Sequence, residues 1–509
     1  MKEDSLLKKY SYRLLSNLIN LLKNLMSVSI VPQALGPDNY GAYSFLTNFF
    51  LSSIKFLKVG IPDAFLTKFS SRQNEKNLVG VYFYFTLTIV LLLSVLTFTL
   101  VKIGYADIVW PQQKTIFIYL ALIFGVLSFL SESNFITNDA LGNTIIYEKK
   151  NVIRSIIFVF CLIIISYLNV LTLANYFILQ YLSFTFIIIF GLIIIRKDFL
   201  DWREVFLIKK NRFIYYCKEF FNFSHPLFSN KLIVYISSIF DLWLLQFFYG
   251  SEEQAFFHLG LKIGGVFFIF TSSVTTLIVR DFSINFTNED NIRIKNVFNQ
   301  IPVFYFVSSY FGIFVSLHAD HIIQILGQED YINAIMPISI LALYSLHRTY
   351  GQLIGGLFIS MSKTKVLRNV VSTMGLFGII LSFIILAPEH YFGFQAGASG
   401  LGFKMVIIQF FQVNILLMIA TKILKISFKK YLVNQFSIIL IHTMSALFSL
   451  EITNFFCSNF SFKFFLISGF VYSIIILSVV ILYPQIIFKT KKDLSLLYNS
   501  IFVLRKKYL

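Results

Sequence analysis

Long apolar runs, broken by short polar and mostly basic segments, extend along the whole chain. A stretch of about 20 apolar residues is long enough to cross the hydrocarbon core of a membrane as an α-helix. The strands of a membrane β-barrel would instead alternate apolar and polar residues over about ten positions. The pattern predicts about 14 transmembrane helices, at residues 10–35, 40–62, 78–103, 115–138, 152–172, 174–196, 219–249, 252–279, 297–317, 332–360, 366–387, 395–421, 431–451 and 463–487. We therefore expect an all-α polytopic membrane protein.

A basic stretch divides these helices into a group of six and a group of eight. Its seven basic residues are Arg196, Lys197, Arg203, Lys209, Lys210, Arg212 and Lys218. Aromatic side chains recur within it at roughly helical spacing, at Phe199, Trp202, Phe206 and Phe213. This pattern favours a basic helix that lies on the membrane surface and joins two halves. A solvated linker is the alternative.

Four segments follow from this division. We expect an N-lobe of helices 1–6 at residues 1–196, and a basic cytoplasmic linker helix at residues 197–218. A C-lobe of helices 7–12 would occupy residues 219–421, and helices 13 and 14 with a basic cytoplasmic tail would occupy residues 422–509.

The first and seventh predicted helices carry a faint internal repeat. Leu-Leu-Ser-Asn at residues 14–17 has a counterpart, Leu-Phe-Ser-Asn, at residues 227–230. Gly-containing segments end both helices, at residues 35–39 and 249–253, and they are displaced along the chain by nearly the same amount as the Ser-Asn pairs. Parallel repeats of six helices, with the substrate site between the halves, occur in transporters. The repeat supports two six-helix lobes in a parallel arrangement.

Composition agrees with a membrane protein and explains the net charge. The 509 residues are 57% hydrophobic, 18% aromatic and 13% charged, whereas soluble domains are about 25% charged. The charge of +18 need not indicate nucleic acid. With the N-terminus inside, cytoplasmic segments hold 33 Lys/Arg, and external segments hold three, namely Lys102, Lys114 and Lys463. This bias predicts an even number of helices with both termini in the cytoplasm. The polar N-terminus leads directly into a full-length helix, so we expect no cleaved signal peptide.

Several classes of chemistry are disfavoured. The external segments are short, whereas a membrane-bound glycosyltransferase or polymerase usually needs a sizeable external loop or a catalytic loop that bears carboxylates. Cys161, Cys217 and Cys457 suggest neither a disulfide framework nor a metal site. The segment His318-Ala-Asp-His321 is more typical of a polar loop than of a metal site. The sequence lacks the P-loop, GxSxG, HExxH and dinucleotide motifs, so we expect no cofactor.

Charged and polar residues inside the predicted helices are the candidate functional groups. A Lys or Arg at the centre of a membrane helix costs about 2.5–3.5 kcal/mol on the insertion scale, so such residues should face a wet cavity or be paired. The first helix carries a polar stripe of Arg13, Asn17, Asn20, Asn24 and Ser27, with Lys23 beside it. The second carries Asn48, Ser52, Lys55 and Lys58, and later helices carry Lys231, Lys262, Arg348 and Lys404.

Acidic partners for these bases are few. Glu132 and Asp241 lie deep in predicted helices, and Asp63 and Glu219 lie near cytoplasmic ends. The resulting cavity should be cationic and attract an anionic ligand, for which phosphate is the obvious group. For each base, snorkelling or a structural ion pair is the alternative, and for Lys58 this alternative is favoured.

Two kinds of group could couple an ion to transport. Asp241 and Glu132 are candidates, and each could equally be the structural partner of a base. His258 and His347 lie inside helices and could carry a proton, although core packing is the more usual role of such residues.

Three short motifs resemble one family. They are Leu-Gly-Pro-Asp-Asn-Tyr-Gly-Ala-Tyr at residues 35–43, Ile-Leu-Gly-Gln-Glu-Asp-Tyr-x-x-Ala at residues 325–334, and Ser-Met-Ser-Lys-Thr-Lys at residues 360–365. The chain resembles the Wzx-like O-antigen and polysaccharide flippases of the multidrug/oligosaccharidyl-lipid/polysaccharide exporter superfamily. The resemblance implies two six-helix lobes around a central cavity, two further helices and alternating access. It also implies a bacterial inner-membrane protein that moves undecaprenyl-pyrophosphate-linked sugar repeat units to the periplasmic leaflet, and is not an enzyme.

The resemblance gives the candidate residues roles as substrate-binding groups. The cations that would offset pyrophosphate and acidic sugars are Lys23, Lys55, Lys231, Lys262, Arg348 and Lys404. The amides that would bind sugar hydroxyls are Asn17, Asn20, Asn24 and Asn48. A polysaccharide polymerase and a chain-length regulator are candidate partners, in the synthesis of lipopolysaccharide for example.

Two other functions remain open. A multidrug exporter of the same superfamily would share the fold, but cationic drugs require buried carboxylates. A lipid-linked polysaccharide polymerase would share the hydrophobicity, but would be expected to have a large external loop.

Overall fold

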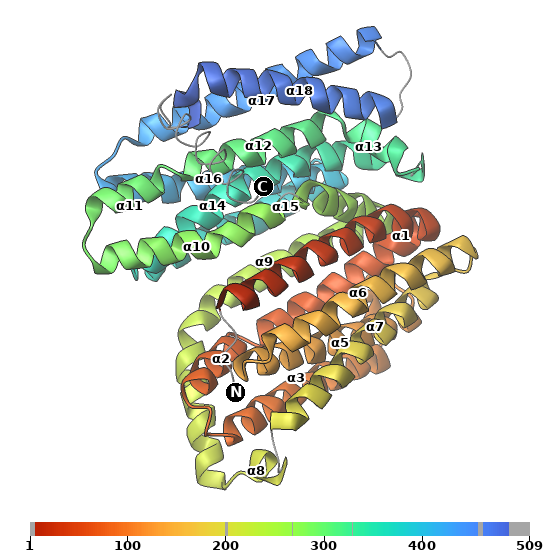
Figure 1. Cartoon of the computed structure of the whole chain (residues 1–509). Helices are drawn as coiled ribbons and strands as arrows, with labels where there is room; N and C mark the ends of the chain where they lie inside the picture. Colours follow the sequence, from red (N-terminus) through yellow and green to blue (C-terminus); the bar gives the residue numbers. More distant parts are fainter. Residues whose placement is uncertain (1–5, 199–201, 267, 328, 457–461, 488–509) are drawn as a thin grey trace, which may run out of the picture. The chain divides into compact units, whose positions relative to one another are not determined.

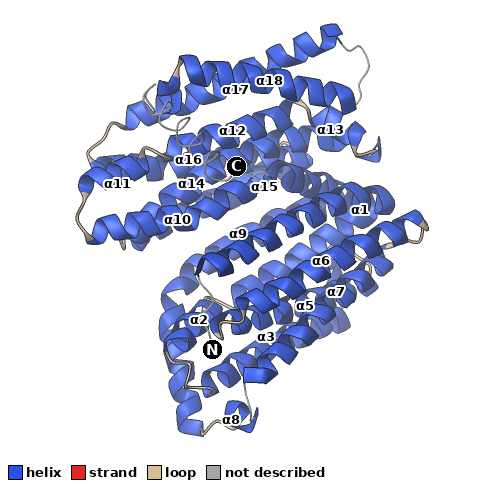
Figure 2. Cartoon of the chain, in the orientation of Figure 1, coloured by secondary structure: helices blue, strands red, loops and turns tan. Residues whose placement is uncertain are grey.

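The regular elements of the structure, a computed structural model, are all helical in the part of the chain that it describes (Figure 2). The described residues are 6–198, 202–266, 268–327, 329–456 and 462–487. Eleven stretches among them are long and apolar enough to cross a membrane. The all-α polytopic class predicted from the sequence is therefore confirmed. The chain forms two compact units, Met1–Ala255 and Phe256–Leu509.

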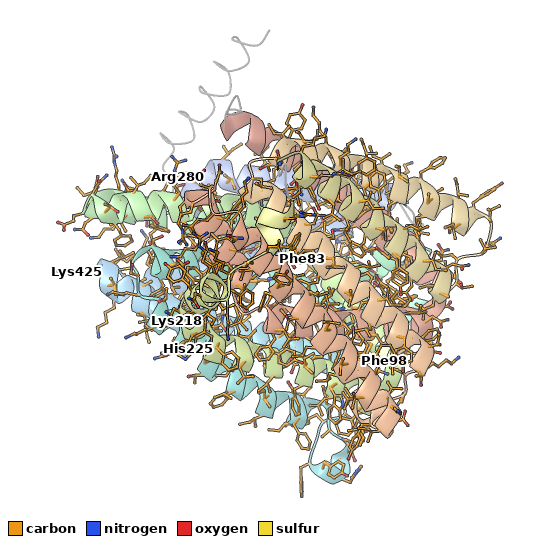
Figure 3. All side chains as sticks on the ribbon, turned by 90° about the horizontal axis from the view of Figure 1, so that it is seen from below. Phe83, Phe98, Lys218, His225, Arg280 and Lys425 are labelled. Carbon is orange, nitrogen blue, oxygen red and sulfur yellow. The ribbon has the colours of Figure 1, made fainter. Side chains whose placement is uncertain are left out.

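The first unit is built on α1, which packs against α5 and α6, while α7 packs against both of these (Figure 1). Its helices are α1 (Leu6–Leu57), α2 (Ile61–Ser71), α3 (Asn77–Ile103), α4 (Ala106–Val109), α5 (Thr115–Ala140), α6 (Thr144–Tyr167), α7 (Leu173–Asp198), α8 (Trp202–Phe206) and most of α9 (Lys210–Gly265). One side of α3 presents apolar side chains outward, including Phe83 and Phe98 (Figure 3). Such a surface fits contact with lipid.

The second unit is organised around α14, which packs against α10, α12 and α16. Its helices are α10 (Phe268–Thr287), α11 (Asn291–Phe298), α12 (Ile301–Leu317), α13 (Ala319–Ile325), α14 (Ile335–Ser360), α15 (Thr364–Leu386), α16 (Gly397–Leu424), α17 (Phe428–Phe456) and α18 (Phe462–Leu482), with short 3₁₀ turns η1 (Glu329–Ala334), η2 (Glu389–Tyr391) and η3 (Pro484–Ile487). Buried tyrosines, among them Tyr305, Tyr350 and Tyr431, lie in its apolar core. Helix α17 packs on α12 and on α18, and His442 Nδ1 of α17 lies 2.7 Å from Tyr472 Oη of α18.

Two of the observed helices, α1 and α9, run through a kink, and each of them covers parts of two predicted helices. Gly36 (φ 71°, ψ 168°) interrupts α1, and Gly250 (φ 77°, ψ −163°) interrupts α9. Each long helix therefore contains the end of one predicted segment and the start of the next. Both kinks fall within the Gly-containing segments of the sequence repeat, at residues 35–39 and 249–253. The same break recurs in both halves of the predicted pseudo-repeat.

Some predicted boundaries were wrong. The helix predicted to begin at residue 152 begins at Thr144, and the one predicted at 219 begins at Lys210. The segment predicted at 252–279 is divided between α9 and α10. Polar residues that face protein, rather than water, account for the early start of α6, as the contacts of Asn151 show below.

The predicted basic linker contains two helical pieces. The short helix α8 is followed by a non-helical break at 207–209 and then by the first turns of α9. Val205, Tyr216 and Phe220 are buried in a cluster with Phe65 and Tyr82 of α2 and α3. This packing anchors the linker to the first unit. Phe199 lies outside the described residues.

Candidate functional site

The predicted polar and cationic residues of α1 form two groups with different neighbours. We call Asn20, Lys23, Glu148 and Arg154 the α1–α6 cluster. We call Lys55, Lys58, Asp63, Glu132 and Lys231 the α1–α9 cluster. Both lie in the first unit, and in both the bases outnumber the acids.

The α1–α6 cluster places two cations near each other. Lys23 is half-buried, and its Nζ lies 5.6 Å from the centroid of the Phe158 ring. Arg154, which is also half-buried, is close enough to interact unfavourably with the charge of Lys23. Glu148 is buried within electrostatic range of Arg154. Nε of Arg154 makes no hydrogen bond within the described part of the chain. The cluster retains an excess of positive charge.

Sequence reasoning missed Arg154. It was assigned to a cytoplasmic segment because the predicted helix began only at residue 152. In the structure Asn151 Nδ2 donates to Ser16 Oγ at 3.0 Å, and Ser155 Oγ donates to Asn20 Oδ1 at 2.8 Å. The spacing of Glu148, Asn151 and Ser155 by three and four residues marks one helical face. This polar stripe was the sequence feature that could have placed Arg154 within a helix.

The four predicted asparagines are not equivalent. Asn20 accepts the hydrogen bond from Ser155, and Asn48 Nδ2 donates to the carbonyl of Ser44 at 2.7 Å. Asn17 and Asn24 are exposed on α1. The first two amides already have partners within the unit, so Asn17 and Asn24 are the better placed to meet a ligand.

The α1–α9 cluster contains one ion pair and two further lysines. Lys58 Nζ lies 2.5 Å from Glu132 Oε1, which is the structural pairing favoured for Lys58 by the sequence. Lys231 is half-buried and interacts electrostatically with Asp63, Lys58 and Lys55. Lys55 is exposed. With three lysines and two carboxylates, the cluster is net positive.

Aromatic and polar contacts position Lys231 beside α1. The ring of Tyr235, one turn further along α9, stacks on Phe56 with centroids 4.7 Å apart. Tyr235 Oη also lies 3.1 Å from Ser53 Oγ. These contacts hold α9 against the second half of α1, and so bring Lys231 to Lys55.

The two candidate ion-coupling carboxylates have different surroundings. Glu132 is 45% exposed at its side chain but bound to Lys58. Asp241 is half-buried in α9. Two residues further along, Trp243 Nε1 donates to the carbonyl of Ile108 at 2.7 Å. The role of both acids in ion coupling stays a prediction.

The three cations of the second unit are placed differently from one another. Arg348 is exposed, and its guanidinium carbon lies 4.1 Å from the centroid of Phe268 and 5.9 Å from that of Tyr344, as in a cation–π contact. Lys262 is exposed near the end of α9. Lys404 is only 4% exposed in α16. Arg348 and Lys262 are accessible to a ligand, whereas Lys404 is buried.

The histidines have mainly structural surroundings. The ring of His347 is buried, with its centroid 5.2 Å from that of Phe410 and 5.9 Å from that of Tyr305. The polar loop predicted at residues 318–321 is instead the start of α13, and both of its histidines are buried. His318 Nε2 lies 2.8 Å from Ser468 Oγ, and His321 Nδ1 lies 2.8 Å from Asp320 Oδ1. These contacts give His318 and His321 a packing role.

An ion network joins α2 to the start of α9. Arg72 Nη2 donates to both carboxylate oxygens of Glu219 at 2.8 Å, and Lys68 Nζ lies 3.0 Å from Oε1. Burial alone would raise the pKa of Glu219. The hydrogen bonds and charges of Arg72 and Lys68 outweigh it and hold this pKa below its ordinary value. The carboxylate is therefore ionised at neutral pH.

Kinked helices at repeated positions, and cationic side chains within membrane-length helices, are features that occur in transporters built from repeats. The chain belongs to the polysaccharide biosynthesis protein family, whose model matches residues 6–280. A search among curated proteins finds no match.

Solved structures with the same fold are transport proteins. A lipid II flippase, MurJ, in an inward closed conformation, is 17% identical with a TM-score of 0.67, over 95% of this chain and all of that one. A multidrug resistance MATE family transporter of the MOP superfamily, in an inward-facing conformation, is 13% identical with a TM-score of 0.55, over 83% and 99%. A MOP superfamily transporter from Pyrococcus furiosus, described as having a binding pocket of reverse polarity, is 13% identical with a TM-score of 0.52, over 82% and 93%.

These findings confirm the family resemblance and the exporter-type fold expected from the sequence motifs. The solved structures reported above are a flippase and transporters. At such low identities the solved structures bear on the fold alone.

Proposed function

We propose that this protein is a flippase for undecaprenyl-pyrophosphate-linked oligosaccharide repeat units. It would move them from the cytoplasmic to the periplasmic leaflet of a bacterial inner membrane, for the synthesis of O-antigen or another surface polysaccharide. The family match to polysaccharide biosynthesis and the flippase-type fold support this function. The observation that carries it is the approach of Lys23 and Arg154 within membrane helices, with Glu148 as the acid near Arg154.

The charge arrangement suits a pyrophosphate. Two cations that repel each other both gain when an anion comes to lie beside them, and charge-assisted hydrogen bonds to phosphate are among the strongest. Lys55 and Lys231 in the α1–α9 cluster offer a second site of the same kind. We assign the pyrophosphate and acidic sugars to these four cations, and name Lys262 and Arg348 of the second unit as further candidates.

Neutral sugar groups need hydrogen-bond partners rather than charge. The exposed amides of Asn17 and Asn24 lie on α1, the first less than two turns before Lys23 and the second directly after it. A sugar attached to a pyrophosphate at Lys23 would be within reach of both amides. The polyprenyl chain would remain in the bilayer, and no covalent bond would change, so the protein would act without being an enzyme. Alternating access would carry the headgroup across.

The first test is the leaflet distribution of lipid-linked repeat units in cells that lack this chain. We expect repeat units to accumulate on the cytoplasmic face and to be released when the gene is restored. Arg348→Ala and Lys262→Ala should impair this rescue while the protein still inserts. Normal surface polysaccharide in both variants would argue against a substrate-binding role for these two cations.

Two other outcomes would identify other functions. Repeat units that reach the periplasmic face but stay unpolymerised would indicate a polymerase. An unchanged lipid-linked pool with raised drug sensitivity would indicate a multidrug exporter, the function of the MATE neighbours. The pairing of Glu132 with Lys58 speaks against that function, because a cationic drug needs an available carboxylate. Within the proposed pathway, a polymerase and a chain-length regulator remain candidate partners.

A further inference from the structure

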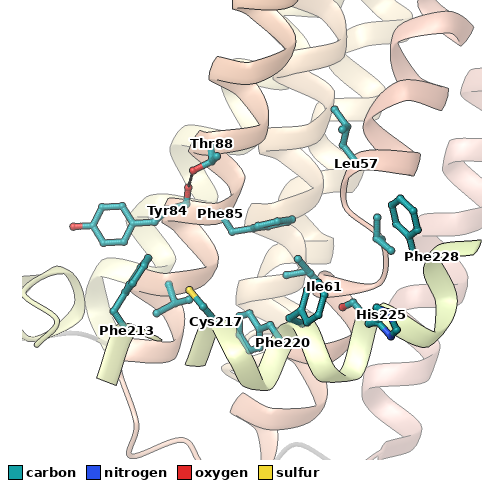
Figure 4. A pocket seen from close by; sticks show the side chains of 14 residues that line it. Leu57, Ile61, Tyr84, Phe85, Thr88, Phe213, Cys217, Phe220, His225 and Phe228 are labelled. Atoms are coloured by element: carbon teal, nitrogen blue, oxygen red, sulfur yellow. Dashed lines mark hydrogen bonds between the residues drawn. The ribbon is translucent and has the colours of Figure 1, made fainter. Parts of the chain in front are cut away.

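An apolar cavity of about 610 Å³ lies in the first unit, and no residue of the two charged clusters lines it (Figure 4). It is bounded by the end of α1, the first three turns of α3 and residues 213–228 of α9. Pockets for small ligands and cofactors typically measure about 300–1,000 Å³. The cavity is therefore large enough for a ligand.

The lining is mostly aromatic and aliphatic. From α3 come Tyr84 and Phe85, and from α9 come Phe213 and Phe220, as the close-up in Figure 4 shows. Phe221 of α9 also lines the cavity. Phe221 and Tyr84 are also exposed, so the cavity opens to the outside of the unit. An open, apolar cavity of this kind suits a hydrocarbon chain better than a sugar.

The cavity begins at one end of the membrane-spanning helices and extends inward from there. Its α3 wall, residues 81–88, begins one turn after the helix starts at Asn77. Its α9 wall, residues 213–228, ends just before the membrane-spanning stretch that begins at Lys231. A chain entering here would come from the adjacent leaflet.

The α9 wall is amphipathic. Its lining residues Phe213, Cys217, Phe220, Ser224 and Phe228 recur every three or four positions, which places them on one helical face. Exposed basic residues flank this face, with Lys209, Lys210 and Arg212 at or near the start of α9 and Lys218 directly after Cys217. An apolar helical face that is flanked by basic residues is suited to the interface of an anionic membrane.

Basic groups lie at the opening itself. Lys218 is exposed and lies three residues before the lining residue Phe221, so the two side chains share one edge of the helix. His225 lines the cavity on the same stretch of α9 (Figure 4). The neighbouring acid, Glu219, is engaged by Arg72 and Lys68. The surroundings of the opening therefore favour an anionic headgroup.

We propose that this cavity binds one acyl chain of an anionic membrane phospholipid, whose headgroup lies against Lys218. The apolar lining and the volume of the cavity suit the acyl chain, and Lys218 at the edge of α9 favours a negatively charged headgroup. The lipid is a bound component of the bilayer, distinct from the transported molecule, so the inference does not depend on the proposed function.

The test uses the full chain in nanodiscs that contain phosphatidylglycerol with a photoreactive diazirine in its acyl chain. After irradiation, the adducts are mapped by peptide mass spectrometry. We expect them on residues 81–88 and 213–228. Thr88 lines the cavity, so Thr88→Trp should fill it and remove these adducts. Leu87→Trp is the matched control, because the Leu87 side chain is exposed and does not line the cavity.

The headgroup is tested separately. Lys218→Gln should lower labelling by phosphatidylglycerol about fivefold, the effect of one Lys near an anionic lipid surface, without altering the cavity. Lys425→Gln, in an exposed turn after α16, is the control.

Equal labelling by diazirine phosphatidylcholine would overturn the preference for an anionic lipid. Labelling unchanged by Thr88→Trp would overturn the site, and displacement by equimolar polyprenyl phosphate would assign the cavity to the transported lipid instead.

Discussion

Gly36 and Gly250 break their helices in the same way, with φ of 71° and 77°, at corresponding positions of the two repeated segments. Their ψ angles, 168° and −163°, complete a backbone conformation that is essentially restricted to glycine. The two residues therefore hold equivalent turns in the two copies of a repeated helix pair. Their environments differ, because a Cβ on Gly36 would meet nothing within 4 Å, whereas one on Gly250 would lie 2.7 Å from Gln112 Oε1.

Replacing either glycine by alanine should lower stability by different amounts. Gly36→Ala should cost about 1–3 kcal/mol from backbone strain, and Gly250→Ala should cost more because Gln112 must also move. Thermal unfolding of the purified protein in detergent measures both. Gly265→Ala is the control, since Gly265 has no positive φ and open space around its Cβ position. Equal melting temperatures for all three variants would show that the kinks are not strained for alanine.

The approach of Lys23 to Arg154 predicts opposite changes in stability and transport. Lys23→Gln removes one of two cations that repel each other, so the protein should become more stable. Transport should fall about tenfold or more, because a charged hydrogen bond to substrate is worth about 1.5–3 kcal/mol. Thermal unfolding and the rescue of surface polysaccharide test the two effects. Lys102→Gln, at an exposed position at the end of α3, is the control. A variant that loses stability and transport together would indicate a structural role for Lys23.

The Lys58–Glu132 pair predicts a restoring double substitution. Glu132→Gln leaves Lys58 without its acid and should lower the melting temperature, while Lys58→Gln combined with Glu132→Gln should recover most of the loss. If the pair is structural, the transport rate of the double variant should also depend on pH in the same way as that of the wild-type protein. Loss of the pH dependence of transport in the double variant would instead indicate that Glu132 is an ion-coupling residue.

The pKa of Glu219 predicts how the α2–α9 ion network depends on pH. This pKa is lower in the folded protein than its ordinary value of 4.5. The network therefore contributes stability above that pH, and the contribution is lost as pH falls through the folded-state pKa. Glu219→Gln should lower the melting temperature at pH 7, and the difference from wild type should shrink below about pH 4.5. A difference that persists unchanged at pH 3.5 would show that the carboxylate charge is not the source.

Membrane helices could be predicted from the sequence because lipid selects for length and hydropathy alone. The spans of α3, α5 and α7 were placed within a few residues for this reason. The start of α6 could not be placed in this way, because Asn151 resembles a loop residue until its partner on α1, Ser16, is known. Hydropathy reports contact with lipid and does not distinguish water from a polar protein neighbour.

The same ambiguity limited the prediction of the site. The polar stripe of α1 was visible in the sequence, but it contains both packing and exposed residues. Asn20 receives a hydrogen bond from Ser155, whereas Asn17 and Asn24 are exposed. Spacing identifies a shared face and cannot say which members of the face another helix covers. Arg154 was missed because the cation that it approaches, Lys23, lies on a helix far away in the chain.

The uninterrupted course of α9 from Lys210 to Gly250 makes the length of this segment more important than its composition. The cavity wall, Lys231 and Asp241 follow one another on a single helix, so their directions are fixed by the number of residues between them. One added or deleted residue would turn everything beyond it by about 100°. Related chains should therefore vary in the residues of this segment and keep its length.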